Sequence, residues 1–298
     1  MTVATRFRPD HGLTARMLLT VVLLVVVYAA FVVALVVLLR SVVLVAVVAG
    51  GFLLVQFWFS DRIALYAMRA TLVTPEQQPR LHGVVDRLCA TAGMDKPAIA
   101  VAATDLPNAF ATGRSSRRAV LCVTDGLLRR LDTAELEGVL AHELSHVAHR
   151  DVAVMTVASF LGVLAGLLMR LGFYSSMFGG RGRRDSLALV VLGVLAVSGA
   201  VYALSFLLTR ALSRYRELAA DRSAAVLTGQ PSALASALVK VSDDIARIPT
   251  RDLRTVQPFN AFLFAPALGT GIGLAGLLST HPPLQERLDQ LAALAVQM

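Results

Sequence analysis

Two histidines four residues apart flank a glutamate in the segment His142-Glu143-Leu-Ser-His146. Residues at positions i and i+4 lie on one face of an α-helix, so both imidazoles can reach a single metal ion. Neutral imidazole is a good zinc ligand, and a glutamate next to the first histidine lies beside the metal without binding it. The spacing predicts His142 and His146 as metal ligands and Glu143 as a general base for an attacking water. The alternative is a surface helix with solvated histidines.

The residues before this motif carry the signal of a helix start. In Asp132-Thr-Ala-Glu135 the aspartate can accept from an early backbone N–H while the glutamate reaches back, which is a capping box. The pattern predicts a helix from near Thr133 to about His149. We interpret His149 as a charge near the helix C-terminus, where positive charge is favoured, and not as a metal ligand.

A catalytic metal needs a third protein ligand and an open position. The candidate is Glu217, within Ser213-Arg-Tyr-Arg-Glu-Leu-Ala-Ala-Asp221, which reads as a helix. Asp221 lies four residues on, where a carboxylate can hold a ligand imidazole in one tautomer. The alternative is an exposed helix with charge pairs at i,i+4 spacing among Arg210, Arg214, Glu217, Asp221 and Arg222. Two histidines and a carboxylate also suit ferrous iron, but the adjacent glutamate favours zinc hydrolysis.

Long apolar runs surround these candidate residues. Hydrophobic residues make up 56% of the 298, above the 45–50% typical of soluble domains. Arg16 to Arg40 frames a first run long enough to cross a bilayer, and Ser41 to Ser60 is a second. A signal peptide has a shorter apolar region. Residues 1–62 are therefore predicted to form a membrane hairpin, and residues 63–298 a cytoplasmic catalytic domain interrupted by a hydrophobic helix pair at about 152–209.

The arginines suggest an orientation for the first hairpin but not for the second. Three precede the first span and two follow the second (Arg6, Arg8, Arg16, Arg62 and Arg69), which predicts that both flanks are cytoplasmic. The later runs, Val152 to Phe173 and Leu187 to Thr209, are joined by a link with three arginines. If both runs span, that link lies outside against the rule. The pair therefore either spans, dips into the membrane or packs on the catalytic domain.

The net charge of +8 has two interpretations. Basic residues at the cytoplasmic ends of spans face acidic lipid head groups. Nucleic-acid binding is not predicted, because no basic stripe is interleaved with aromatic residues. The two cysteines, Cys89 and Cys122, are too few for a disulfide scaffold and are predicted to be small buried side chains in a reducing compartment.

A short sheet is predicted upstream of the catalytic helix. Pro107-Asn-Ala-Phe-Ala-Thr-Gly113 and the strand Ala119 to Thr124 are joined by a Gly-Arg-Ser-Ser turn, which indicates a hairpin with one edge near the metal. An extended substrate can add a strand to such an edge, so Asn108, Ala109 and Phe110 are candidate substrate-binding residues. The alternative is a purely structural hairpin. His82, in a helical pattern from about Gln77 to Ala92, is interpreted as a surface histidine.

With these residues in place, the chain resembles the HtpX-type membrane zinc metalloproteases, which are relatives of the CAAX prenyl endopeptidases. The order of hairpin, H-E-L-S-H helix, hydrophobic pair and E-x-x-x-D helix carries the resemblance. Three further segments look like family signatures: Pro107–Gly113, Val123-Thr-Asp-Gly-Leu-Leu128 and Ser279-Thr-His-Pro-Pro283 leading to Arg287.

The resemblance implies roles for residues in these segments. It implies that Glu217 is the third zinc ligand and Asp221 its support, and that His281 and Arg287 line the active site. His281 would then donate a hydrogen bond to the developing oxyanion. Its alternative is a purely structural place before a helix, since Pro282 and Pro283 suit a first helical turn.

The resulting hypothesis is a mainly α-helical membrane protein with a small β-sheet, in which a zincin-like metalloprotease core joins transmembrane helices. It binds one Zn²⁺ per chain. By resemblance it is a multi-pass endopeptidase of the bacterial inner membrane, with a cytoplasmic active site, that cleaves misfolded or damaged membrane proteins at cytoplasmic segments. Its partners are membrane lipid and polypeptide substrates, and no oligomeric state is predicted. A prenyl-protein endopeptidase and a non-catalytic zinc scaffold are the rival classes.

Overall fold

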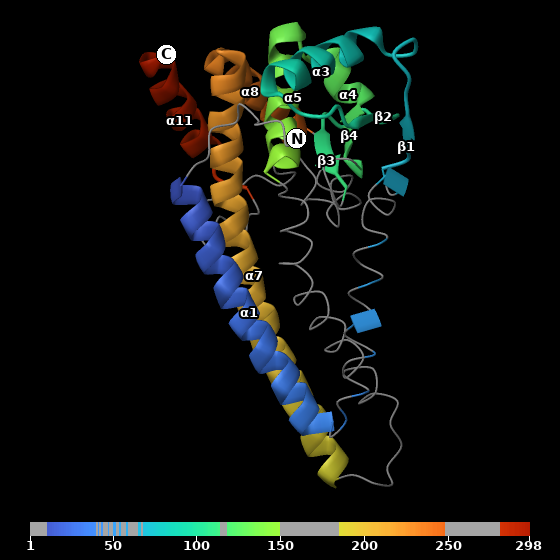
Figure 1. Ribbon diagram of the computed structural model, residues 1–298, viewed down its shortest axis with the longest axis vertical. Coiled ribbons are helices and arrows are strands. Elements are labelled where there is room, and N and C mark those ends of the chain that lie inside the picture. The colour runs from blue at the N-terminus through green and yellow to red at the C-terminus, as the bar shows by residue number, and fades with distance from the viewer. Residues whose placement is uncertain are drawn as a thin grey trace. The chain divides into compact units, whose positions relative to one another are not determined.

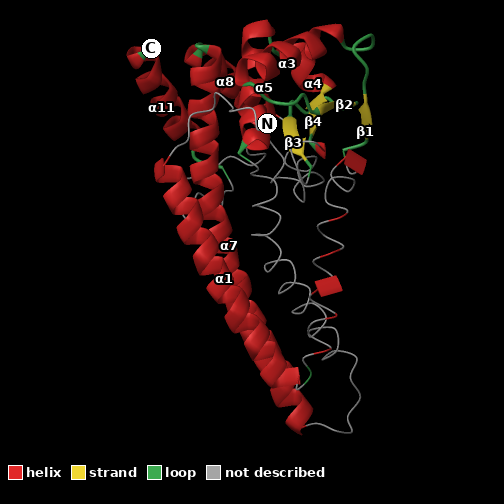
Figure 2. Cartoon of the chain, in the orientation of Figure 1, coloured by secondary structure: helices red, strands yellow, loops and turns green. Residues whose placement is uncertain are grey.

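The computed structural model describes residues 11–39, 65–66, 68–113, 118–149, 185–247 and 281–298, with single positions at 41, 43, 47, 50, 51, 54 and 58. The chain divides into two compact units. One comprises residues 1–13, 60–153 and 213–298, and the other residues 14–59 and 154–212. Helices predominate in the described residues and a small sheet accompanies them (Figure 2). This confirms the predicted mainly helical fold.

Two long helices run side by side in the second unit (Figure 1). They are α1 (His11–Leu39) and the part of α7 (Asp185–Thr228) that ends at residue 212. Phe31 and Leu35 of α1 pack against Val201 of α7, and Leu24 packs against Leu212. Many of their remaining large apolar side chains are exposed. Such a surface suits lipid, because large exposed apolar side chains are unfavourable in water and favourable against lipid tails.

Within the described ranges, two segments are long and apolar enough to cross a membrane. They are Leu18–Val37 in α1 and Leu192–Thr228 in α7. They overlap the first and last of the four predicted runs. The third run, Val152 to Phe173, the arginine-rich link at 179–184 and most of the second run lie outside the described residues. The predicted domain boundaries and the course of the second hydrophobic pair therefore stay predictions.

A four-stranded sheet organises the other unit. It consists of β1 (Ala70–Leu72), β2 (Ala98–Ala102), β3 (Ala109–Thr112) and β4 (Val120–Thr124), in the spatial order β1-β2-β4-β3. β2 and β4 are parallel, and the outer pairs β1–β2 and β3–β4 are antiparallel. The β3–β4 pair is the hairpin expected from the sequence. Its strand β3 forms an edge of the sheet.

The sheet is apolar on both faces because successive residues of its central strands, which point to opposite faces, are nearly all apolar. One face joins the main core beneath the helices α3 (Pro79–Ala92), α5 (Thr133–Ala148), α8 (Pro231–Arg247) and α11 (Leu284–Gln297). This face presents Ile99, Val101, Ala109, Leu121 and Val123. Alternate residues on the opposite face, among them Phe110 and Cys122, form a second cluster with Leu65 and Met68. A short helix, α4 (Asp125–Arg130), follows β4 directly.

Helix α5 begins at the predicted capping box. The Asp132 carboxylate accepts from the Glu135 N–H at 2.9 Å, and the Glu135 carboxylate accepts from the Asp132 N–H at 3.0 Å. The other Glu135 oxygen binds two residues of α8, the Ser236 hydroxyl at 2.7 Å and the Lys240 ammonium at 2.5 Å. Gly138 marks the close approach of the two helices, since a Cβ there would lie 3.2 Å from the Leu234 Cα. The start and the orientation of α5 are thus set by several independent contacts.

The prediction that His82 lies at the surface is wrong. Only 6% of its area is exposed, and its Nε2 lies 3.1 Å from the Val73 carbonyl, to which it donates. Helix α3 buries a wide face over the sheet, including the neighbours Leu81 and Val84. The spacing of apolar residues along α3 does not by itself show whether a polar residue such as His82 lies on its buried or its exposed face. Both cysteines are buried, as predicted.

Replacing Asp132 by alanine should remove the side-chain cap of α5 and lower the free energy of unfolding by about 1 kcal/mol. In a unit of this size the melting temperature should fall by about 2–4 °C. Thermal unfolding of the detergent-solubilised protein measures the change. Asp132→Asn keeps an acceptor oxygen and should lose much less. A melting temperature of Asp132→Ala equal to that of the wild-type protein would show that the cap contributes nothing to stability.

Candidate metal centre

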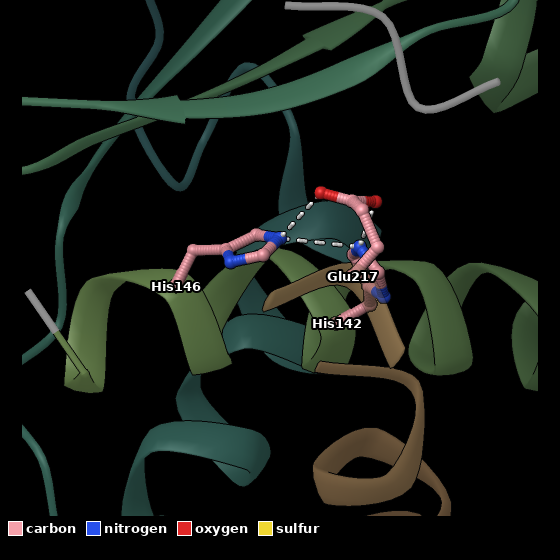
Figure 3. A group of neighbouring side chains, drawn as sticks. All are labelled: His142, His146 and Glu217. Carbon is pink, nitrogen blue, oxygen red and sulfur yellow. Dashed lines mark hydrogen bonds and ion pairs between the residues drawn. The ribbon is translucent and has the colours of Figure 1, made fainter. Parts of the chain in front are cut away.

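Three potential metal ligands from two helices converge in the unit that contains the sheet (Figure 3). His142 and His146 project from α5, and Glu217 projects from the C-terminal part of α7. Their ligand atoms all lie within 4.8 Å of one another, and all three side chains are buried. The structure therefore brings together the three residues that were predicted to hold a metal.

The gaps between the ligand atoms test whether an ion fits. The Nε2 atoms of His142 and His146 are 3.3 Å apart. The Glu217 oxygens lie 3.5 Å from each of these nitrogens. Ligands at about 2.0–2.2 Å from a tetrahedral Zn²⁺ are separated by about 3.3–3.5 Å. The separations in the protein equal those around a tetrahedral ion, so the two imidazole nitrogens and the carboxylate fit a divalent metal ion such as Zn²⁺.

A buried carboxylate fixes the orientation of His142. Asp221 Oδ1 lies 2.8 Å from the His142 Nδ1, on the ring side opposite the ligand nitrogen. Arg287 of α11 donates to both Asp221 oxygens at 2.7 Å. Since Nδ1–H donates to Asp221, the Nε2 lone pair is directed toward the metal position. Asp221 and Arg287, both expected to support the site, are placed in contact with it.

The charge on His142 depends on the same contacts. Burial opposes the charged imidazole, but the hydrogen bonds to Asp221 and Glu217 outweigh it and raise the pKa of His142 to about 9. Without a metal ion, His142 therefore holds a proton at neutral pH and donates to Glu217. A binding metal ion has to displace that proton.

Glu143 lies beside the ligand group but turns toward the sheet. Its Oε2 accepts a hydrogen bond from the Ala111 N–H of β3 at 3.1 Å. Only 5% of its area is exposed, and burial raises the pKa of its carboxyl. A carboxylate held in a dry site next to a metal position is suited to accept a proton.

Two further side chains contact the ligand residues. The Nδ1 of His281, just before α11, lies 3.1 Å from Glu217 Oε2. The guanidinium of Arg216 lies 3.4 Å from the His146 Nδ1. His281 was expected near the site, whereas Arg216 was not. Its only sequence signal is its position next to Glu217, and helical spacing alone places it off the ligand face.

Of the predicted substrate-binding residues, Asn108 directly precedes β3, and Ala109 and Phe110 are its first two residues. Asn108, Ala109 and Phe110 are each at most 3% exposed. The Asn108 carbonyl accepts from the Thr124 N–H and its own N–H donates to the Thr124 hydroxyl, which ties this end of β3 to β4. His149 is the C-cap of α5 and its Nδ1 donates to the Ser145 carbonyl, in accord with its interpretation as a helix-end residue.

The affinity of the metal-free protein for Zn²⁺ should rise with pH. Because His142 holds a proton below about pH 9 and each bound ion releases it, apparent affinity should increase about tenfold per pH unit and level off near that pH. Competition with a chromophoric chelator measures the affinity. Asp221→Asn removes a contact that raises the His142 pKa, so its plateau should begin at lower pH. An affinity that is constant from about pH 7 to 9 would contradict the assignment.

Comparison with known proteins identifies the family. The family model described as Peptidase family M48 matches residues 75–295. Protease HtpX homolog 1 of Streptomyces coelicolor is 62% identical over 294 residues, which are 99% of this chain and 96% of the relative. The protease HtpX homolog of Moorella thermoacetica is 49% identical over 290 residues, which are 97% of this chain and 96% of the relative.

A solved structure extends the comparison to the fold. The crystal structure of S. mikatae Ste24p superposes with a TM-score of 0.56 at 18% identity, covering 95% of this chain and 67% of the other. At this identity the likeness concerns the fold alone. The sequence matches, by contrast, run through the segments that carry the ligand group. The chain therefore belongs to peptidase family M48 and is a membrane metalloprotease of the HtpX type.

Proposed function

We propose that the protein is a zinc-dependent endopeptidase in which His142, His146 and Glu217 hold the metal. The observation that carries this proposal is the set of 3.3–3.5 Å separations among their ligand atoms. A catalytic zinc site consists of three such protein ligands with a fourth position left for water or substrate. When bound, Zn²⁺ would supply a Lewis acid that lowers the pKa of a water and polarises the scissile carbonyl.

Glu143 is the proposed general base. Its carboxylate accepts a proton from the water that attacks the scissile carbonyl carbon, and it passes that proton to the leaving amine nitrogen. Burial raises the pKa of Glu143, which favours acceptance of the proton from the water. The hydrogen bond from the Ala111 N–H leaves the second carboxylate oxygen, Oε1, for this task.

His281 is proposed to stabilise the oxyanion. Its Nδ1 faces Glu217 Oε2 at 3.1 Å, so the opposite ring nitrogen, Nε2, is the atom that would donate to the substrate's carbonyl oxygen. Asp221 and Arg287 act one contact further away, through His142. Their role is to keep the ligand imidazole in one tautomer and orientation.

The proposed substrate lies as an extended strand along the outer edge of β3, which ends the strand order among the described residues. The side chains of Ala109 and Phe110 are buried, so recognition there would involve backbone groups and read little of the substrate sequence. Loose specificity suits a protease acting on misfolded or damaged membrane proteins at cytoplasmic segments. We propose this role by the resemblance to HtpX-type proteases, with the enzyme multi-pass in the bacterial inner membrane.

Replacing Glu143 by glutamine should leave zinc binding intact and abolish cleavage, because an amide cannot accept the water's proton. The loss in kcat should be on the order of 10²–10⁴-fold. Cleavage of an unfolded model protein by the zinc-loaded, detergent-purified enzyme measures it. Glu137→Gln, on the same helix but paired with Arg87, is the matched control and should cleave normally. Full activity in Glu143→Gln would overturn the mechanism.

A cytoplasmic active-site unit should be shielded from reagents that do not cross the membrane. Burial raises the pKa of Cys89 to about 11 and that of Cys122 to about 12, so the native thiols should be unreactive. A cysteine introduced at the exposed position Glu76 should react with an impermeant maleimide only after cells are permeabilised. Labelling of Glu76→Cys in intact cells would place this unit on the opposite side.

A further inference from the structure

The two edges of β3 are used differently. In an antiparallel pair, alternate residues direct their N–H and C=O groups to the partner strand. Asn108 faces β4, because its carbonyl accepts from the Thr124 N–H, and the register then turns Phe110 and Thr112 the same way. Ala109 and Ala111 therefore direct their backbone groups away from β4. The bond from the Ala111 N–H to Glu143 confirms this alternation.

The outward N–H of Ala111 is bound to the side chain that the mechanism uses as its base. A glutamate side chain has three rotatable bonds, and its loss of freedom opposes a defined position. The Ala111 N–H donates to Oε2 at 3.1 Å in a buried setting, where a charge-assisted bond is strong. One oxygen is thereby anchored to the sheet. The other can point in only a limited range of directions.

We infer that the backbone N–H of Ala111 is a positioning group for catalysis, which holds Glu143 so that Oε1 receives the proton of the attacking water. This inference rests on the proposed function. The strand β3, which is expected to bind substrate, also orients the base. The backbone groups that pair with substrate and the N–H that holds Glu143 therefore belong to one rigid element. A proton-transfer partner has to lie within hydrogen-bond reach of its target, which makes such anchoring valuable.

The assignment also limits how a substrate pairs with β3. The Ala111 N–H is already used, so an added strand would pair with the N–H and C=O of Ala109 and with the C=O of Ala111. Substrate binding and positioning of the base are then separated by two residues along the strand. Removing the N–H at one position should affect binding, and removing it at the other should affect the chemical step.

Proline substitutions can separate these two effects. Proline removes a backbone N–H, and an edge strand tolerates it where that N–H points away from the sheet. In Ala111→Pro we expect kcat to fall on the order of 10²-fold with little change in KM, because the base loses its anchor. In Ala109→Pro we expect the reverse, a raised KM with kcat largely kept. Ala111→Gly retains the N–H and should restore most of the kcat lost in Ala111→Pro. Zinc content and melting temperature, measured alongside, report whether each variant is folded.

Hydrogen exchange tests the same contact without a change in β3. In wild type the Ala111 amide should be protected by Glu143, and in Glu143→Ala a peptide covering residues 109–113 should gain a fast-exchanging amide. Glu137→Gln is the control and should show the wild-type pattern. This measurement decides the question if Ala111→Pro fails to fold, and it needs no catalytic activity.

The outcomes distinguish this inference from the proposed function. If Ala111→Pro cleaves at the wild-type rate, or if exchange at residues 109–113 is unchanged in Glu143→Ala, Ala111 has no positioning role. The proposed function would still stand as long as Glu143→Gln is inactive. If Glu143→Gln cleaves normally, the proposed function itself fails and the inference fails with it.

Discussion

The buried ion pair between Asp221 and Arg287 is the interaction on which the metal centre depends. Neither side chain is more than 2% exposed, and ionised groups removed from water need close partners. Two hydrogen bonds of 2.7 Å join them, and a third contact, at 2.8 Å, extends from Asp221 to His142. The set links α7, α11 and α5, so three helices are held in the one arrangement that satisfies a buried carboxylate. Loss of either partner would leave a buried charge next to the ligand histidine.

Helix α5 takes part in nearly every other constraint on the site. Its N-terminus is fixed by the capping box and by the contacts of Glu135 with α8, and its middle approaches α8 at Gly138. Its motif residues then face two different neighbours. The ligand nitrogens of His142 and His146 face Glu217 of α7, whereas Glu143 faces β3. A single helix can present a metal site and a proton acceptor together because neighbouring positions point about a quarter turn apart.

Local patterns predicted several parts of this arrangement well. The capping box placed the start of α5, and the helix runs over Thr133–Ala148 as expected. The turn signal between two apolar segments indicated the β3–β4 hairpin, and the continuing helical pattern carried Glu217 and Asp221 on one face of α7. Where two faces of a helix were open to interpretation, as at His82, the pattern assigned the wrong one. The contact of Arg216 with His146 was not anticipated, because helical spacing places Arg216 off the face that carries Glu217 and Asp221.

The sequence by itself determined the features that depend on short-range geometry. The i,i+4 spacing of His142 and His146 places two imidazoles on one helical face wherever that helix lies, and the fold had no part in that choice. Only the tertiary structure brings the two candidate carboxylates to the histidines, since Asp221 meets His142 across 79 positions of sequence. It also decided that the Ala111 N–H meets Glu143, since a backbone amide has no side-chain identity for a sequence pattern to reveal. Long-range contacts of this kind arise from packing helices and sheet around a shared core, and they are properties of that packing.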